Sequence, residues 1–173
     1  DGGSSAFAGT IHHITARTPE CRVEVLIPDF KGDTDALNVT LDARPDILNH
    51  NIETVPRLFP SVRSQGSYRR SLDVLAHAKQ PGIVTKSGVI VGMGELMAEV
   101  EAVMQDLRSV KCDMLTIGQY LQPTKAHRPV SRFYDPAEFE ALRNTGVNMG
   151  FTHVESGPLV RSSYHAEQQG REV

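Results

Sequence analysis

Short runs of apolar, often β-branched residues alternate along this chain with longer segments of helical periodicity. The strand-like runs are residues 23–27, 47–52, 88–91 and 114–117. The helix-like segments are residues 5–18, 33–43, 67–79, 96–110 and 135–146. Of these, 96–110 has the clearest apolar face. Strands that alternate with helices of this length predict βαβ units, and therefore a parallel sheet in an α/β fold.

Polar residues follow each of the expected strands. In chain order they are Asp29, then Asn49, Asn51 and Glu53, then Glu95, and finally Gln119 and Tyr120. Ligands of parallel sheets bind at the carboxyl ends of the strands, so these groups would meet at one rim. Four strands cannot close a barrel, because a small barrel needs about eight strands or a covered opening. We therefore expect an amino-terminal part outside this chain to supply the rest.

The composition limits the classes of function. A chain of 173 residues with 39% hydrophobic content can bury one sizeable core. A net charge of -3 gives no electrostatic reason to expect nucleic acid or an anionic membrane surface as a partner, and no apolar run is long enough to span a bilayer. Cys21 and Cys112 lack CxxC-type neighbours, so they indicate neither a disulfide framework nor a cluster site, and a reducing compartment is favoured.

Glycines surround the end of the third strand-like run, in the string GVIVGMGE at 88–95. Gly88 and Gly92 would let the backbone approach a flat ligand closely, and Ile90 would pack on the face of that ligand. A plain glycine-rich turn, with Glu95 favouring the helix start, explains the string about as well. The string is not a Rossmann fingerprint, since the third glycine is absent.

Asn49, Asn51 and Glu53 fall at alternating positions, so they would share one face of a strand, with His50 on the other. Amide and carboxylate groups suit a ribose or an amino-acid ammonium. Strand-end residues that cap a turn are the alternative. His50 and Glu53 would point to opposite faces, so we do not expect a histidine metal site.

Two further features of the chain are polar. Arg69 and Arg70 stand at a helix start and would suit an anionic ligand, although solvated surface arginines are commoner. Ser162 and Ser163 lie in a stretch, 156–165, that is rich in glycine, proline and hydroxyl groups. A disordered terminus is the alternative there, and no acid or base partner for a serine nucleophile is legible in the sequence.

Six strings of the sequence, taken together and in order, resemble the carboxy-terminal half of lipoyl synthase, a family of radical S-adenosylmethionine (SAM) enzymes. They are VEVLIPDF (23–30), LNHNIETVP (48–56), YRRSL (68–72), TKSGVIVGMGE (85–95), LTIGQYLQP (115–123) and GPLVRSSYHA (157–166). The opening Asp1-Gly2-Gly3 resembles the DGG that follows an early barrel strand of the family. Six ordered matches over nearly the whole chain are more specific than any one of them.

The resemblance implies a partial (β/α)6 TIM-like radical-SAM barrel, of which this chain supplies about the last four strands plus a carboxy-terminal extension. Residues 1–134 would be the barrel part, and residues 135–173 a helix and serine tail packed on it. The implied enzyme is a sulfurtransferase that inserts two sulfurs, at C6 and C8 of a protein-bound octanoyl chain, to make the lipoyl cofactor. Its implied cofactors are two [4Fe–4S] clusters and SAM, which one cluster cleaves to a 5′-deoxyadenosyl radical.

The resemblance also implies roles for residues of this chain. For SAM, the matched positions are Asn49, Asn51, Glu53, Arg70, Gly88, Ile90, Gly92, Glu95, Gln119 and Tyr120. Ser162 or Ser163 would be a ligand of the auxiliary cluster, alongside three cysteines near the amino terminus of the family. No residue is assigned a catalytic role.

The implied partners are an octanoylated lipoyl carrier protein or domain and an iron–sulfur carrier. The carriers of the family are the glycine cleavage H protein and the E2 component of 2-oxoacid dehydrogenases. Neither nucleic acid nor a membrane is an expected partner. The bacterial cytoplasm and the mitochondrial matrix both suit the family.

The sequence departs from the family pattern in two ways. Leu96 stands where the family usually has Thr, and both cluster cysteine motifs are absent, because Cys21 and Cys112 lie at the wrong places. The chain alone is therefore expected to bind neither cluster and to be inactive. One alternative is a non-catalytic fragment or binding module. The other is a different radical-SAM sulfur-inserting enzyme, and the RSSY tail and LNHNIETVP argue against that second alternative.

Overall fold

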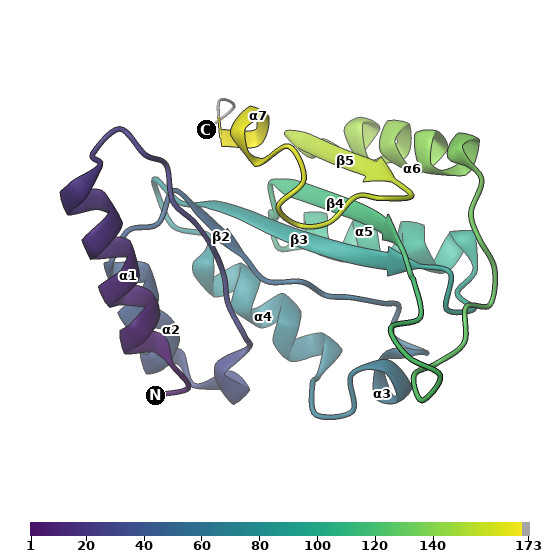
Figure 1. The fold of residues 1–173 in the computed structure, drawn as a ribbon, viewed down its shortest axis with the longest axis horizontal. Coiled ribbons are helices and arrows are strands. Elements are labelled where there is room, and N and C mark those ends of the chain that lie inside the picture. Colours follow the sequence, from purple (N-terminus) through teal and green to yellow (C-terminus); the bar gives the residue numbers. More distant parts are fainter. Residues whose placement is uncertain (171–173) are drawn as a thin grey trace.

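Five parallel strands form one sheet in this computed structural model, which describes residues 1–170 (Figure 1). In spatial order, which is also chain order, they are β1 (Glu24–Leu26), β2 (Ile47–Asn49), β3 (Val84–Val91), β4 (Met114–Gln119) and β5 (His153–Gly157). All four neighbouring pairs are parallel. The α/β fold with a parallel sheet is therefore confirmed.

Helical segments precede, connect and follow the strands. They are α1 (Ser4–Arg17), a 3-10 turn (Phe30–Gly32), α2 (Thr34–Asp42), α3 (Phe59–Val62), α4 (Tyr68–Ala78), α5 (Met97–Ser109), α6 (Pro136–Asn148) and α7 (Ala166–Gly170). Helix α6 begins as its sequence predicts, since the Glu138 carboxylate accepts from the Asp135 N–H at 2.9 Å in a capping box. Within residues 1–170, no helix has the length and apolar character needed to cross a membrane.

The two faces of the sheet differ in what covers them. Helices α4, α5 and α6 pack on one face, which we call the helix-covered face (Figure 1). The core on that side includes Leu75, Val89, Val103, Ile117 and Leu142. Successive side chains of a strand alternate between faces, so Lys86, Gly88 and Ile90 of β3 point to the opposite face. We call this second face the open face, and the carboxy-terminal segment 158–165 crosses it (Figure 1).

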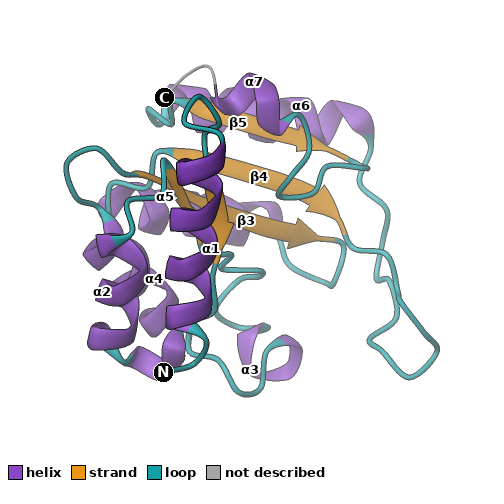
Figure 2. Cartoon of the chain, turned by 60° about the vertical axis from the view of Figure 1, so that its left-hand side comes forward, coloured by secondary structure: helices purple, strands orange, loops and turns teal. Residues whose placement is uncertain are grey.

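A second apolar cluster lies at the β1 end of the sheet. Helix α1 stands against α2 there (Figure 2). Ile11 of α1, Leu37 and Leu41 of α2 and Val25 of β1 are buried together in this cluster. Helices α1 and α2 therefore pack against β1, the edge strand of the sheet.

Several elements differ from the sequence-based expectations. Strand β5 was not expected, because His153–Gly157 contains one β-branched residue and so carries little strand signal. Strand β3 begins at Val84 rather than at residue 88, and β2 ends at Asn49 rather than at residue 52. The early part of β3 is polar, which hid it from a search for apolar runs.

The proposed division of the chain at residue 134 stays a prediction. Strand β5 and helix α6 both lie beyond that point, and β5 pairs with β4 in the same sheet. Residues 171–173 of the expected extension lie outside the described residues.

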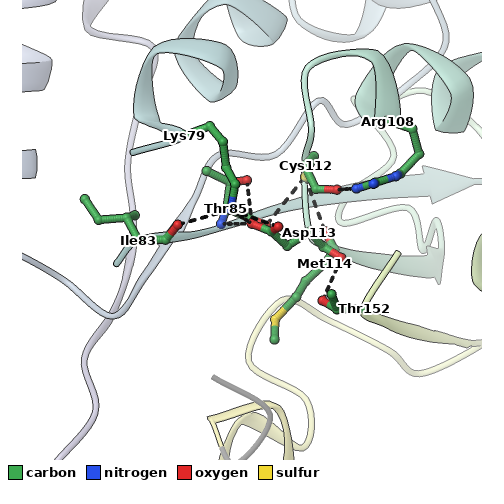
Figure 3. Close-up of polar contacts among 8 residues, drawn as sticks. All are labelled: Lys79, Ile83, Thr85, Arg108, Cys112, Asp113, Met114 and Thr152. Atoms are coloured by element: carbon green, nitrogen blue, oxygen red, sulfur yellow. Dashed lines mark hydrogen bonds and ion pairs between the residues drawn. The ribbon is translucent and has the colours of Figure 1, made fainter. Parts of the chain in front are cut away.

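At the amino ends of the strands, Asp113 ties four elements together (Figure 3). Its carboxylate accepts from Lys79 Nζ at 2.7 and 2.9 Å, from the Thr85 N–H at 2.8 Å and from Thr85 Oγ1 at 3.0 Å. Its carbonyl accepts from the N–H and the hydroxyl of Thr152, at 2.8 and 3.0 Å. The network joins the end of α4 to the starts of β3, β4 and β5.

Replacing Asp113 by Ala is expected to lower the free energy of unfolding by about 2 kcal/mol. Hydrogen bonds to a charged group are each worth about 1.5–3 kcal/mol, but the Lys79–Asp113 ion pair is partly exposed, which reduces its contribution. Urea denaturation measures the change. Arg69→Ala is the control, since Arg69 and Asp73 form an exposed pair on one helix, and such pairs contribute about 0.3–0.5 kcal/mol. Equal effects of the two substitutions would contradict the role of Asp113.

Candidate functional site

A row of buried polar groups crosses β1, β2 and β3 on the open face. The Glu24 carboxylate accepts from Asn49 Nδ2 at 2.9 Å and from Lys86 Nζ at 2.9 and 3.0 Å. Asn49 and Lys86 are both fully buried. Buried charges are costly unless they are paired and hydrogen-bonded, so the three groups depend on one another.

Asn49 and Asn51 each leave one buried acceptor without a partner. Among the described residues, no donor reaches the Oδ1 atom of either side chain. Buried polar atoms of native proteins nearly always have a partner, so unpaired acceptors at a strand end point to a ligand that brings donors. His50 points the other way, as alternation predicts, and its ring nitrogens contact the Ile27 carbonyl and the Ser71 hydroxyl.

Gly88 lies directly beside Asn51. A Cβ atom at this position would come within 2.7 Å of Asn51 Oδ1 and 2.9 Å of Thr116 Oγ1. Any side chain here would therefore displace the unpaired amide oxygen. The missing side chain leaves a hollow at the carboxyl half of β3, lined in addition by Ser162 of the tail.

Glu53 continues the strand-end polar motif alongside β3. Its N–H donates to the Gly88 carbonyl at 2.9 Å, and its carbonyl accepts from the Ile90 N–H at 2.8 Å. Its backbone is left-handed, with φ of 69°, which turns the chain away from the sheet. Burial raises the pKa of the Glu53 carboxyl, although the charge of Arg63 and a hydrogen bond from Asn51 act against that rise.

A cavity of about 290 Å³ adjoins these strand ends. It is lined by Glu53, Val62, Arg63, Ile90, Met93 and Tyr120. The cavity thus combines apolar walls with one carboxylate, one guanidinium and one phenol, a composition typical of sites for small organic ligands.

Glu95 shapes the glycine-rich loop after β3. Its carboxylate accepts from the Gly92 N–H at 2.6 Å, from the Met93 N–H at 2.9 Å and from the Tyr134 hydroxyl at 2.8 Å. Gly92 has a φ of 107°, which favours glycine. Burial and the hydrogen bond to Glu95 raise the pKa of Tyr134 to about 12. Glu95 is therefore engaged with its own loop and holds the backbone that follows Ile90.

Replacing Tyr134 by Phe is expected to lower the free energy of unfolding by about 1–2 kcal/mol, because the buried Glu95 carboxylate loses a donor. Thermal melting measures the loss. Tyr120→Phe is the matched control, since the Tyr120 hydroxyl donates at the surface, to the Arg128 carbonyl at 2.8 Å, and we expect a change under about 0.5 kcal/mol. A Tyr134→Phe variant as stable as the parent would show that Glu95 does not need this donor.

Gln119 and Tyr120 divide their roles at the end of β4. The Gln119 side chain is buried, donates to the carbonyls of Tyr120 and Arg132 at 3.1 Å each, and accepts from the Tyr134 N–H at 3.0 Å. It braces the loop that follows β4. Tyr120 lines the 290 Å³ cavity, so of the two residues it is the one placed to touch a ligand.

The structure places Arg70 away from that cavity. Its Nε lies 2.7 Å from Asp29 Oδ2, and its guanidinium also donates to the Gln65 carbonyl at 3.1 Å. Burial alone would raise the pKa of Asp29, but hydrogen bonds from Arg70 and from the Lys31 N–H lower it. Arg63 is the arginine at the strand-end cavity, where it donates to the Asn51 carbonyl at 2.8 Å.

The serine tail is folded against the sheet. Val160 is buried, and the Ser162 carbonyl accepts from Lys86 Nζ at 2.5 Å. The rings of Tyr164 and His165 are tilted by 38° with their centroids 4.0 Å apart. Ser162 lines the hollow beside Gly88, whereas Ser163 is exposed. The structure thus brings Asn51, Gly88 and Ser162 together, at the rim of the candidate site.

The described residues do not make an iron–sulfur site. Cys21 is exposed, and Cys112 is buried in the core of the helix-covered face, where burial raises the pKa of its thiol to about 12. Within residues 1–170, no group of three His, Cys, Asp or Glu side chains could hold a metal ion. The unpaired amide oxygens and the hollow at Gly88 do suit an organic ligand with several donors.

Sequence reasoning missed three residues that the fold brings to this site. They are Arg63 at the cavity, Lys86 under the tail and Tyr134 against Glu95. None belongs to a motif that a spacing rule detects. Lys86 lies before the expected strand at 88–91, so the sequence did not mark it as a buried charge.

Parallel βα units whose sheet has one helix-covered face and one open face define a partial TIM-like barrel. The crystal structure of methylornithine synthase (PylB) has this fold, with a TM-score of 0.64 and 15% identity over 91% of this chain and 53% of that chain. That likeness concerns the fold alone.

Curated relatives of this chain are lipoyl synthases. This chain is 59% identical over 171 residues to the lipoyl synthase of Rubrobacter xylanophilus, covering 98% of this chain and 53% of the relative. It is 55% identical over 175 residues to that of Symbiobacterium thermophilum, covering 100% and 55%. No protein-family model matches the chain. The resemblance to lipoyl synthase is thus confirmed, and the chain spans about half the length of the relatives it matches, consistent with the carboxy-terminal half.

Proposed function

We propose that this chain supplies the carboxy-terminal half of a lipoyl synthase, a radical-SAM sulfurtransferase that inserts two sulfurs at C6 and C8 of a protein-bound octanoyl chain. The observation that carries the proposal is the 59% identity to the Rubrobacter xylanophilus enzyme over 98% of this chain. The unpaired acceptors of Asn49 and Asn51 on the open face support it, because they occur where the family motif predicts a ligand.

The strand ends would bind SAM, which supplies a 5′-deoxyadenosyl radical in this family. Asn51 would accept a hydrogen bond from a hydroxyl or ammonium group through its unpaired oxygen. Glu53 would pair with an ammonium once that charge offsets its burial. Gly88 and Ile90 would contact adenine, and Ile90 lines the cavity together with Tyr120.

The remaining matched residues would act more indirectly. Gly92 and Glu95 set the loop beside the adenine surface, and Gln119 holds the loop after β4. Arg63 lines the cavity and could pair there with a carboxylate of the ligand. Arg70 is paired with Asp29 and would have to break that ion pair first.

Ser162 or Ser163 would provide an oxygen ligand to the auxiliary [4Fe–4S] cluster. All cluster thiolates would come from the part of the relatives that this chain does not span. The substrate would be an octanoylated carrier protein or domain, and an iron–sulfur carrier would renew the cluster, in bacterial cytoplasm or the mitochondrial matrix.

The test is a fusion in which this chain replaces the corresponding half of the Rubrobacter xylanophilus enzyme. After anaerobic loading with iron and sulfide, we expect the fusion to form 5′-deoxyadenosine from SAM and to convert an octanoylated H protein to its lipoyl form, followed by mass spectrometry. A fusion that carries both clusters yet forms neither product would reject the proposal. The same fusion with Gly157→Ala is the control, since a Cβ there makes only an ordinary contact, at 3.4 Å from Val160 Cγ2.

A further inference from the structure

Lys86 is a fully buried lysine on the open face, and it contacts the serine tail. Its Nζ lies 2.9 and 3.0 Å from the two Glu24 carboxylate oxygens and 2.5 Å from the Ser162 carbonyl oxygen. The side chain of Lys86 has no exposed surface, and that of Glu24 is 20% exposed. Because a buried ion pair is weak grounds for stability, its presence here calls for another role.

Lys86 joins β3 to β1 through Glu24 and to the tail through Ser162. Glu24 belongs to β1 and also accepts from Asn49 at the end of β2. Lys86 itself belongs to β3, and Ser162 follows β5 in the chain. The ammonium therefore stands where the tail meets the sheet, with Glu24 and Asn49 fixing its position from the far side.

Gly118 of β4 receives the tail one step earlier. A Cβ atom at this position would collide with the Val160 carbonyl and would lie 2.9 Å from Arg161 Nη1. Two neighbouring strands thus accommodate consecutive parts of the tail, β4 through a missing side chain and β3 through a donor. A tail that merely covered the sheet would need neither feature.

We propose that Lys86 is a positioning residue for the serine pair. Its ammonium, held by Glu24, fixes the Ser162 carbonyl against β3 and so sets where the hydroxyls of Ser162 and Ser163 stand. The inference deepens the proposed function, on which it rests for the step from a placed serine to a cluster ligand. The contact itself depends on this chain alone.

Cleavage by trypsin tests whether the contact between Lys86 and the Ser162 carbonyl holds the tail on the sheet. Trypsin cleaves the bond between Arg161 and Ser162, directly before the Ser162 carbonyl that accepts from Lys86 Nζ, and Arg161 is exposed. In Lys86→Met, we expect cleavage after Arg161 to rise more than tenfold, or about 1.4 kcal/mol, since slow proteolysis follows the population of the opened segment. Cleavage after Arg143, in α6, should stay at the parent rate.

Three further variants keep the test open to failure. Glu24→Gln with Lys86→Met removes both charges, so it avoids an unpaired buried carboxylate and should release the tail equally. Gly118→Ala should release it by collision with Val160 while Lys86 remains. Lys79→Met is the matched control, because it breaks a lysine–carboxylate pair at the opposite ends of the strands (Figure 3) and should leave the cleavage ratio of Arg161 to Arg143 unchanged.

Two results would overturn the inference. One is an unchanged rate after Arg161 in both Lys86 variants. The other is an equal rise after Arg143, which would mean that the whole chain has loosened. This measurement needs neither SAM nor a cluster, so a negative result leaves the proposed function standing. Conversely, serine substitutions that leave the activity of the loaded fusion unchanged would reject the cluster role, but not the contact between Lys86 and the tail.

Discussion

Replacing Gly88 by Val is expected to lower the affinity of the loaded fusion protein for SAM by about a hundredfold, or about 2.8 kcal/mol. The new Cβ would lie within 2.7 Å of Asn51 Oδ1, so it would displace the unpaired acceptor and fill the hollow. Valine is itself well suited to a strand, so the sheet should persist. Isothermal titration calorimetry with SAM measures the loss.

Gly157→Ala is the control for this substitution, because Gly157 also lies in a strand of the sheet and a Cβ there makes only an ordinary contact. The melting temperatures of both variants separate lost binding from lost folding. A folded Gly88→Val protein that binds SAM as the parent does would show that the ligand lies elsewhere.

Replacing the serine proposed as a cluster ligand is expected to stop sulfur insertion, while SAM cleavage continues. A serine oxygen is a harder ligand than a thiolate and holds a soft, sulfur-rich cluster less tightly, so its release would suit a cluster dismantled during turnover. We expect either Ser162→Ala or Ser163→Ala to lose sulfur insertion at least about a hundredfold, or about 2.7 kcal/mol in the barrier. Mass spectrometry of the carrier separates products with one and two sulfurs.

Ser156→Ala is the matched serine control. Its hydroxyl donates to the Phe139 carbonyl of α6 at 2.8 Å, on the helix-covered side, and the change should leave both sulfur insertions intact. Unchanged turnover in both tail variants would contradict a serine ligand. Loss of 5′-deoxyadenosine formation as well would indicate damage to the SAM site instead.

The fold was predictable where side chains follow simple periods. Apolar runs marked β1, β2 and β4, and the Asp135–Glu138 capping pattern marked the start of α6. The first half of β3 was not predicted, because a lysine indicates an exposed position. Lys86 is buried nonetheless, by an ion pair with Glu24 of β1. Strand β5 escaped for a related reason, since pairing with β4 rather than its own sequence stabilises it.

The site was predictable in part. The alternation of Asn49 and Asn51 gave the correct face, and the need for glycine at 88 follows from the neighbouring amide. The same pattern could not tell a ligand contact from a brace. Glu95 accepts from Tyr134, and Arg70 pairs with Asp29. Both partners lie far away in the sequence, so the local pattern could not reveal them.

We propose above that SAM binds at the strand ends of the open face. Hydrogen–deuterium exchange of the cluster-loaded fusion, with and without SAM, tests it most directly. We expect SAM to slow exchange in residues 49–54, 88–95 and 119–120, while α1 and α2 exchange as before. Protection confined to the Asp29–Arg70 rim, or no protection at the strand ends at a saturating SAM concentration, would contradict it.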